Sequence, residues 1–162
     1  MELRDATLDD AAAIAAIYQH YVLNTTISFE ETPPTEAELR QRIDAVRIAG
    51  LPWLVASVDG EVAAYAYATP WRARSAYRFS VETSVYVADG KARRGLGRAL
   101  YRALLERLRD ANVHTVIGGI ALPNHASVAI HEAMNFKKVA HFTEVGQKFG
   151  NWVDVGYWQL HL

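Results

Sequence analysis

The sequence predicts an α+β fold in which a central mixed, mostly antiparallel sheet of about seven strands is flanked by about four helices. Three observations predict it. Hydrophobic residues make up 51% of the 162 positions, enough to bury the core of one domain over residues 1–162. Segments with β-propensity alternate with segments of helical spacing. The turn dipeptide Asp59-Gly60 joins two β-prone segments and predicts an antiparallel hairpin.

The first helix follows a short strand at the N-terminus. Thr7 is suited to cap this helix, because Asp9 and Asp10 then fall in its first turn, where carboxylates interact favourably with the helix dipole. Apolar residues recur at helical spacing from Ala13 to Val22. The pattern predicts a helix with one buried face.

A proline-rich segment at 32–35 predicts a loop after the first helix. Thr35 then begins a second, charged helix, because Glu38 lies three residues on and completes a capping box. This helix is expected to run to about Ile48. The hairpin strands follow at 53–58 and 61–69.

A strand, a loop and a helix form the next unit. Residues 70–77 are a polar, arginine-bearing connection, and residues 79–87 are again β-prone. A glycine-containing loop comes next and leads into a helix whose apolar residues run from Ala99 to Leu108. This order places the loop at the start of a helix.

The last third of the sequence predicts three strands and one helix. Residues 114–122 predict a strand that Gly118-Gly119 interrupts, and Pro123-Asn124 begins a helix through Met134. The final two strands are expected at 136–145 and 152–160, joined by a loop at 146–150.

Composition excludes several classes of function. A net charge of -1 argues against nonspecific binding to nucleic acid, and the absence of cysteine excludes disulfides, thiolate metal sites and a cysteine nucleophile. No signal segment or membrane-spanning apolar run is present, so we expect no membrane association and a cytoplasmic protein. His131-Glu132 lacks the second histidine of a metalloprotease helix, since Asn135 stands there, and we expect no metal.

The loop Arg93-Arg94-Gly95-Leu96-Gly97 predicts an anion site. Glycines at a helix N-terminus let backbone N–H groups approach an anion, and the helix dipole and the arginines add positive potential. A P-loop is disfavoured because Arg98-Ala99 follows where lysine and a hydroxyl residue are needed. A dinucleotide fold is disfavoured because the loop lies mid-chain, after an antiparallel hairpin. Coenzyme A, with its pyrophosphate and long pantetheine arm, fits better.

Several blocks along nearly the whole chain carry a resemblance to a known family. They are Ser28-Phe29-Glu30, 70–77 (PWRARSAY), 81–87 (VETSVYV), 94–100 (RGLGRAL), Leu122-Pro123-Asn124 with Ser127 and His131-Glu132, and 152–159 (WVDVGYWQ). The sequence resembles the GNAT superfamily of acetyltransferases, and within it the phosphinothricin and methionine sulfoximine N-acetyltransferases. The resemblance implies a GNAT-like fold and acetyl-CoA as co-substrate.

The resemblance also implies which residues hold acetyl-CoA. They are Val85, Tyr86, Val87, Arg93, Arg94, Gly95, Leu96, Gly97, Arg98, Asn124 and Ser127. Asn124 can also cap the helix that follows it. Two positions depart from the family pattern. Ala92 replaces the Gln or Arg that usually begins the loop, and Asn135 replaces a glycine, although asparagine tolerates the left-handed conformation.

Three residues are expected to carry the chemistry. An amine is mostly protonated at neutral pH and needs a base, and Glu82 matches the glutamate that serves as general base in the resembled family. The backbone N–H of Val87 is expected to stabilise the oxyanion, if a bulge splays the sheet there. His131 falls where many members place a tyrosine acid; a packing or hydrogen-bonding role is the alternative.

The acceptor is expected to be a small amino acid analogue. Arg72 and Arg74, with Tyr77, match a block that binds acidic oxygens in the resembled enzymes, and guanidinium groups suit carboxylates and phosphinates. Phe29 and Glu31 are expected to close over the substrate and contact its amine. The resemblance also implies a homodimer, with the segment of Lys148, Phe149 and Trp152 at its interface.

Two other functions remain open from the sequence. One is acetylation of another small amine or a peptide N-terminus, which would make the arginines at 72 and 74 dispensable. The other is a non-catalytic acyl-CoA sensor on the same fold, because Ala92 weakens the match of the loop.

Overall fold

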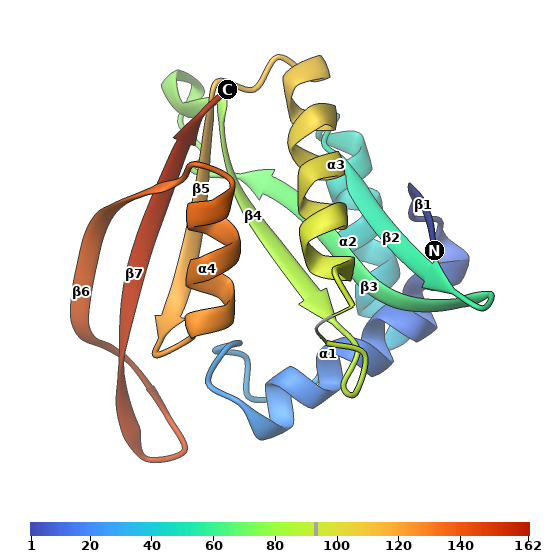
Figure 1. Ribbon diagram of the computed structural model, residues 1–162, viewed down its shortest axis with the longest axis horizontal. Coiled ribbons are helices and arrows are strands. Elements are labelled where there is room, and N and C mark those ends of the chain that lie inside the picture. The colour runs from blue at the N-terminus through green and yellow to red at the C-terminus, as the bar shows by residue number, and fades with distance from the viewer. Residues whose placement is uncertain (93) are drawn as a thin grey trace.

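The structure is a computed structural model that describes residues 1–92 and 94–162 (Figure 1). Its elements are β1 (Glu2–Asp5), α1 (Ala11–Asn24), α2 (Glu36–Ile48), β2 (Trp53–Val58), β3 (Glu61–Pro70), β4 (Ser80–Val87), α3 (Leu96–Asp110), β5 (Thr115–Leu122), α4 (His125–Ala133), β6 (Lys137–Lys148) and β7 (Asn151–His161), with 3-10 turns at Leu8–Asp10 and Ser75–Tyr77. The predicted α+β class is confirmed. None of the described helices is long and apolar enough to cross a membrane.

The strands form one sheet in the order β1-β2-β3-β4-β5-β7-β6. Within the described residues, β4 and β5 run parallel and all other neighbours are antiparallel. The parallel pairing of β4 with β5 extends only from Ser80 to Glu82 on β4, and beyond Glu82 the two strands diverge. β4 stays in regular register with β3 as far as Val87, so the expected bulge is not what opens the sheet.

Helices cover both faces of the sheet and bury two hydrophobic clusters. α3 packs its apolar face on β2, β3 and β4, with residues such as Leu100, Leu104 and Leu108 fully buried. α1 and α2 cover the other face, around Trp53 and Tyr65. Figure 1 shows α3 and α4 in front of the sheet and α2 behind it. Beyond Glu82, where β4 no longer pairs with β5, the backbone edge of β4 is open between the two layers of helices.

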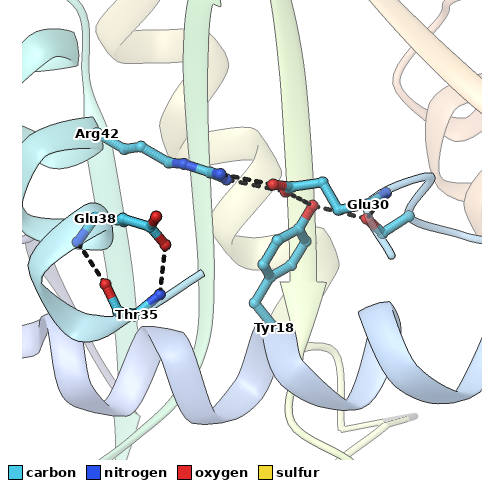
Figure 2. Close-up of polar contacts among 6 residues, drawn as sticks. Tyr18, Glu30, Thr35, Glu38 and Arg42 are labelled. Atoms are coloured by element: carbon cyan, nitrogen blue, oxygen red, sulfur yellow. Dashed lines mark hydrogen bonds and ion pairs between the residues drawn. The ribbon is translucent and has the colours of Figure 1, made fainter. Parts of the chain in front are cut away.

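Short-range signals in the sequence are confirmed. The Thr35 N–H donates to the Glu38 carboxylate at 2.7 Å, and the Glu38 N–H donates to the Thr35 hydroxyl at 3.2 Å, which completes the predicted capping box (Figure 2). Asp59 and Gly60 both have positive φ, as a tight hairpin turn requires. Asn135 takes the left-handed conformation with φ of 69°.

Two predictions about the later strands are wrong. β5 runs without interruption through Gly118-Gly119, because these residues pair with β7 and their missing side chains make room for neighbours. The expected loop at 146–150 shrinks to a turn at Phe149 and Gly150. A register shift after Phe142 lets the end of β6 pair with the start of β7, so the hairpin is longer than predicted.

Candidate active site

Two cavities lie on opposite faces of β4. Successive residues of a strand point to opposite faces of the sheet. Val85 and Val87 line a groove of about 430 Å³, which we call the β4–α3 groove. Glu82, Ser84 and Tyr86 line a hollow of about 460 Å³, the β4–α1 pocket. A cavity of about 50 Å³, bounded by residues of both, lies between them. Ligands in the two cavities would therefore meet at β4.

Most of the predicted cofactor residues gather in the β4–α3 groove. Besides the two valines, its walls include Gly95, Leu96, Gly97, Arg98, Asn124 and Ser127. Tyr86 instead directs its side chain into the β4–α1 pocket, and Arg94 is exposed outside the groove wall. Arg93 lies outside the described residues. Lys91, which no motif indicated, lines the groove and supplies a cation.

The N-terminus of α3 forms one end of the groove. Gly95 has φ of 74°, a left-handed conformation that favours glycine, and it caps the helix. The first helical hydrogen bond runs from the Ala99 N–H to the Gly95 carbonyl at 3.0 Å. The N–H groups at 96–98 precede that bond and have no partner inside the helix. Together with the helix dipole, they suit a pyrophosphate.

The backbone of β4 is open to the groove at Val87. The Ala88 N–H donates to Ala63 on β3 at 2.8 Å, so strand alternation turns the N–H and C=O of Val87 away from β3. The Tyr21 hydroxyl of α1 occupies both groups, donating to the Val87 carbonyl at 2.5 Å and accepting from its N–H at 3.3 Å. An extended ligand with amide groups can replace the hydroxyl at this edge.

Glu82 faces the β4–α1 pocket together with Ser84 and Tyr86. Its side chain is half-buried, and burial raises the pKa of its carboxyl group. Among the described residues, no cation or hydrogen-bond donor offsets this shift. A carboxylate with a raised pKa is a better proton acceptor than an exposed one, as a general base requires.

Gly119 of β5 makes room for the Glu82 carboxylate. A Cβ at this position would lie 3.0 Å from Glu82 Oε1 and 3.1 Å from Tyr157 Cε1. Tyr157 lies opposite Gly119 on β7 and also lines the pocket. The sequence signal was present, since glycine inside a strand often marks a close approach. It did not indicate which group approaches.

His131 is buried on α4, and both of its ring nitrogens have partners. Nδ1 lies 2.7 Å from the Ser127 carbonyl and Nε2 lies 3.0 Å from the Tyr101 hydroxyl. The Tyr101 hydroxyl is also hydrogen-bonded to Thr83 of β4. Burial lowers the pKa of His131 despite the opposing bond to Ser127. This geometry favours a neutral imidazole that links α4 to β4 through Tyr101.

Glu30, not its neighbour Glu31, lines the β4–α1 pocket. Figure 2 shows its carboxylate between Arg42 of α2 and Tyr18 of α1. The Arg42 guanidinium donates to both carboxylate oxygens at 2.9 and 2.6 Å, and it holds the pKa of Glu30 below its usual range. Phe29 lines the pocket as predicted, whereas Glu31 is exposed. The sequence-based prediction selected Glu31, because a single sequence does not show which of two adjacent glutamates faces inward.

Arg72, Arg74 and Tyr77 line a separate hollow of about 350 Å³. An aromatic wall connects it to the β4–α1 pocket. The Arg72 guanidinium lies 5.1 Å from the Trp71 ring centre, and that ring packs edge-on against Tyr157 at 5.8 Å. Burial raises the pKa of Tyr157; the charge of Glu82 adds to this shift and the charge of Arg72 opposes it. The structure thus places Arg72 near the pocket without making it part of the wall.

Known proteins share both the sequence pattern and this architecture. Residues 3–156 match the family described as the acetyltransferase (GNAT) domain. The chain belongs to the GNAT acetyltransferase family. The phosphinothricin N-acetyltransferase of Alcaligenes faecalis is 45% identical over 95% of this chain and 79% of its own. The L-methionine sulfoximine/L-methionine sulfone acetyltransferase of Pseudomonas paraeruginosa is 41% identical over 99% of this chain and 94% of its own.

Solved structures of GNAT acetyltransferases superpose closely. A ribosomal-protein-alanine N-acetyltransferase from Brucella melitensis has a TM-score of 0.98 at 38% identity, covering 100% of both chains. A phosphinothricin acetyltransferase from Sinorhizobium meliloti in complex with acetyl-CoA has a TM-score of 0.96 at 37% identity, covering 99% of this chain and 88% of its own. GNAT acetyltransferases take their acetyl group from acetyl-CoA.

The residues of this GNAT acetyltransferase fit acetyl-CoA on physical grounds. The α3 N-terminus with Lys91 and Arg98 offers donors and cations for a pyrophosphate, and the open edge of β4 offers the Val87 C=O to an amide N–H of the arm and the Val87 N–H to the carbonyl at its end. Ala92 lines the groove with a small side chain that cannot hydrogen-bond a pyrophosphate, so backbone N–H groups and neighbouring cations must bind the pyrophosphate instead. The described residues contain no group of three metal-ligating side chains.

Proposed function

We propose that the chain is one acetyltransferase domain that moves acetyl from acetyl-CoA directly to the α-amino group of a small amino acid analogue such as phosphinothricin or methionine sulfoximine. The Glu82 carboxylate carries this proposal, because it faces the β4–α1 pocket across the strand from the groove and has a raised pKa. The names of the two relatives support the acceptor class.

The proposed mechanism assigns one task to each group. Acetyl-CoA, when bound, supplies the activated acetyl group. Glu82 accepts the proton that the acceptor ammonium must lose before its nitrogen forms the new C–N bond. The Val87 N–H, which now pairs with Tyr21, donates to the acetyl oxygen as that atom gains charge. The C–S bond breaks, and coenzyme A leaves as the thiol after taking up a proton.

His131 is one candidate donor for that last proton, but its engaged nitrogens favour the positioning role. The Tyr21 hydroxyl lies at the open edge of β4, and burial raises its pKa, so it remains protonated at neutral pH. We therefore propose that His131 supports β4 through Tyr101 and that the Tyr21 hydroxyl, which lines the groove and is freed when a ligand takes its place at Val87, is the proton donor.

An acceptor screen tests the function. Purified protein would be incubated with acetyl-CoA and a panel of amino acids, sulfoximines, phosphinothricin, polyamines and short peptides, and free coenzyme A thiol would be followed. We expect release with amino acid analogues. Release with peptides alone would favour the second candidate, N-terminal acetylation, which the Brucella structure's name supports. Acetyl-CoA binding without release from any acceptor would indicate a sensor instead.

Replacing Arg72 or Arg74 by alanine is expected to raise KM for phosphinothricin by about tenfold or more, the size expected when a charge-assisted hydrogen bond to an acidic oxygen is lost. The double variant should act on a simple primary amine as well as the unmodified enzyme does. Steady-state kinetics with both acceptors would measure this. Arg109→Ala, at the exposed end of α3, is the matched control. Equal losses with both acceptors would contradict a role in acidic recognition.

We also propose a homodimer formed through the β6–β7 hairpin. Large apolar side chains are exposed along it, including Phe142, Val145, Phe149 and Trp152. β6 is also an edge strand, and exposed apolar edges tend to be covered by another chain.

Acetyl-CoA is a metabolite of the cytoplasm, which is where we propose that the enzyme works.

Trp152→Glu is expected to shift the protein from dimer to monomer, because it places a charge in the centre of the proposed contact. Sedimentation velocity at several concentrations would measure the mass. Ile48→Glu is the matched control, since Ile48 is 79% exposed at the end of α2 and Trp152 is 62% exposed on the hairpin. A monomeric unmodified protein, or an unchanged mass for Trp152→Glu, would contradict this interface.

A further inference from the structure

Lys148 is a buried lysine at the end of β6. It is only 2% exposed, although the sequence placed it in a segment expected to meet a partner. Its ammonium group donates to the Ser28 carbonyl at 2.6 Å, across 120 residues of sequence. Burial lowers the pKa of Lys148, and the nearby carboxylates of Glu31 and Glu30 oppose this shift. Burying an ammonium group is costly, so its position calls for a function.

The carbonyl that Lys148 holds belongs to a loop that shapes the active site. Ile27 borders both the β4–α3 groove and the β4–α1 pocket, and Phe29 and Glu30 line the pocket. Ser28 itself is buried, with its hydroxyl 2.7 Å from the Tyr18 hydroxyl. The position of one carbonyl therefore fixes side chains on both sides of it.

Gly146 provides a second contact between the same strand and the same loop. A Cβ at Gly146 would lie 2.4 Å from Phe29 Cε2, so the Phe29 ring packs directly on the hairpin backbone. Gly146 and Lys148 are two residues apart and share one face of β6. Figure 1 shows the β6–β7 hairpin reaching down toward the loop that follows α1.

The opposite side of the loop is held by the helices. Arg42 of α2 and Tyr18 of α1 bind the Glu30 carboxylate, as Figure 2 shows. The loop thus spans two supports: helices on one side, and Lys148 with Gly146 on the other. Removing either support would release one wall of the β4–α1 pocket and leave the α3 N-terminus unaffected.

We propose that Lys148 is a positioning residue for the acceptor, which fixes Ser28 and so holds Phe29 and Glu30 against the acceptor in the β4–α1 pocket. This inference rests on the proposed function, because it assumes that the acceptor binds there. It differs from a role at the dimer surface, since the ammonium group points into its own chain.

The test is the Lys148→Met variant, which keeps a long apolar stem and removes the donor. We expect KM for phosphinothricin, or for the best acceptor of the screen, to rise about 10- to 100-fold, the range for losing a hydrogen bond to a charged group. The Kd for acetyl-CoA, measured by titration calorimetry, should stay within about twofold, because among the described residues this loop contributes only Ile27 to the groove and the α3 N-terminus keeps its donors. Lys148→Arg, which keeps a charged donor, should recover much of the loss.

Lys138→Met is the matched control, because Lys138 is exposed on the same strand, where its ammonium group lies 2.9 Å from exposed His141 and 5.3 Å from the Trp158 ring centre. If Lys148→Met does not fold, Gly146→Ala decides, since it displaces Phe29 and leaves Lys148 in place. An unchanged acceptor KM, or a parallel loss of acetyl-CoA affinity, would overturn the proposal. Absence of coenzyme A release by the unmodified protein would instead overturn the proposed function.

Discussion

Replacing Glu82 with glutamine is expected to lower kcat by about 10²- to 10⁴-fold at neutral pH, the usual contribution of a general base. Glutamine keeps the size of the side chain and its hydrogen-bonding capacity, but it cannot accept the proton. The groove proposed for acetyl-CoA lies on the other face of β4, so its Kd should not change. Coenzyme A release and titration calorimetry would measure the two quantities separately.

Glu106→Gln is the matched control, since Glu106 is an exposed glutamate on α3. A Glu82→Gln enzyme with unaltered kcat would remove Glu82 as the base. A loss of acetyl-CoA affinity equal to the loss of kcat would show that the substitution disturbs β4 as a whole.

The same carboxylate predicts a pH dependence. Burial raises the pKa of Glu82, and only the ionised form accepts a proton. The kcat/KM of the unmodified enzyme should therefore fall as pH decreases through a value above the ordinary pKa of glutamate, and the acidic limb should disappear in Glu82→Gln. The pH profile of kcat/KM reports groups of the free enzyme, which is the state that the structure describes.

Gly118→Ala is expected to lower the free energy of unfolding. A Cβ at this position would lie 2.4 Å from His131 Nε2 and 2.7 Å from His131 Cδ2, and the ring is buried. The imidazole would have to move away and lose its bond to Tyr101. Overpacking of this kind costs about 1–3 kcal/mol, so Tm should fall by several degrees.

Gly97→Ala is the control for that experiment. The nearest atoms to a Cβ at Gly97 lie 3.5 Å away on Ile130 and Val87, which is ordinary contact, and alanine favours a helix more than glycine does. Thermal unfolding followed by circular dichroism should therefore give an equal or higher Tm for Gly97→Ala. Equal Tm values for both variants would mean that His131 can relocate at no cost.

The sequence was sufficient for features that depend on neighbours along the chain. The capping box at Thr35, the Asp59-Gly60 turn and the left-handed Asn135 follow from residues only a few positions apart. Strand alternation would likewise have separated Tyr86 from Val85 and Val87, but the family resemblance assigned all three to the cofactor, and Tyr86 faces the β4–α1 pocket. These inferences require only local geometry and a residue count.

Features that depend on distant parts of the chain could not be predicted in the same way. Gly118 and Gly119 looked like a break in a strand, because their neighbours His131, Glu82 and Tyr157 come from other elements. Likewise, the choice of Glu30 over Glu31 depends on Arg42, which α2 brings into reach. A single sequence does not indicate which distant side chains will fill the space next to a small residue.

The alternation along β4 also has a practical consequence for redesign. Ser84 faces the β4–α1 pocket, while its neighbour Val85 faces the β4–α3 groove. Under the proposed function, interleaved positions of one strand thus determine acceptor range and cofactor use, and either set can be varied separately. An engineer could enlarge or recharge one chamber through even-numbered positions, whereas inserting a single residue would exchange the two sets and abolish both.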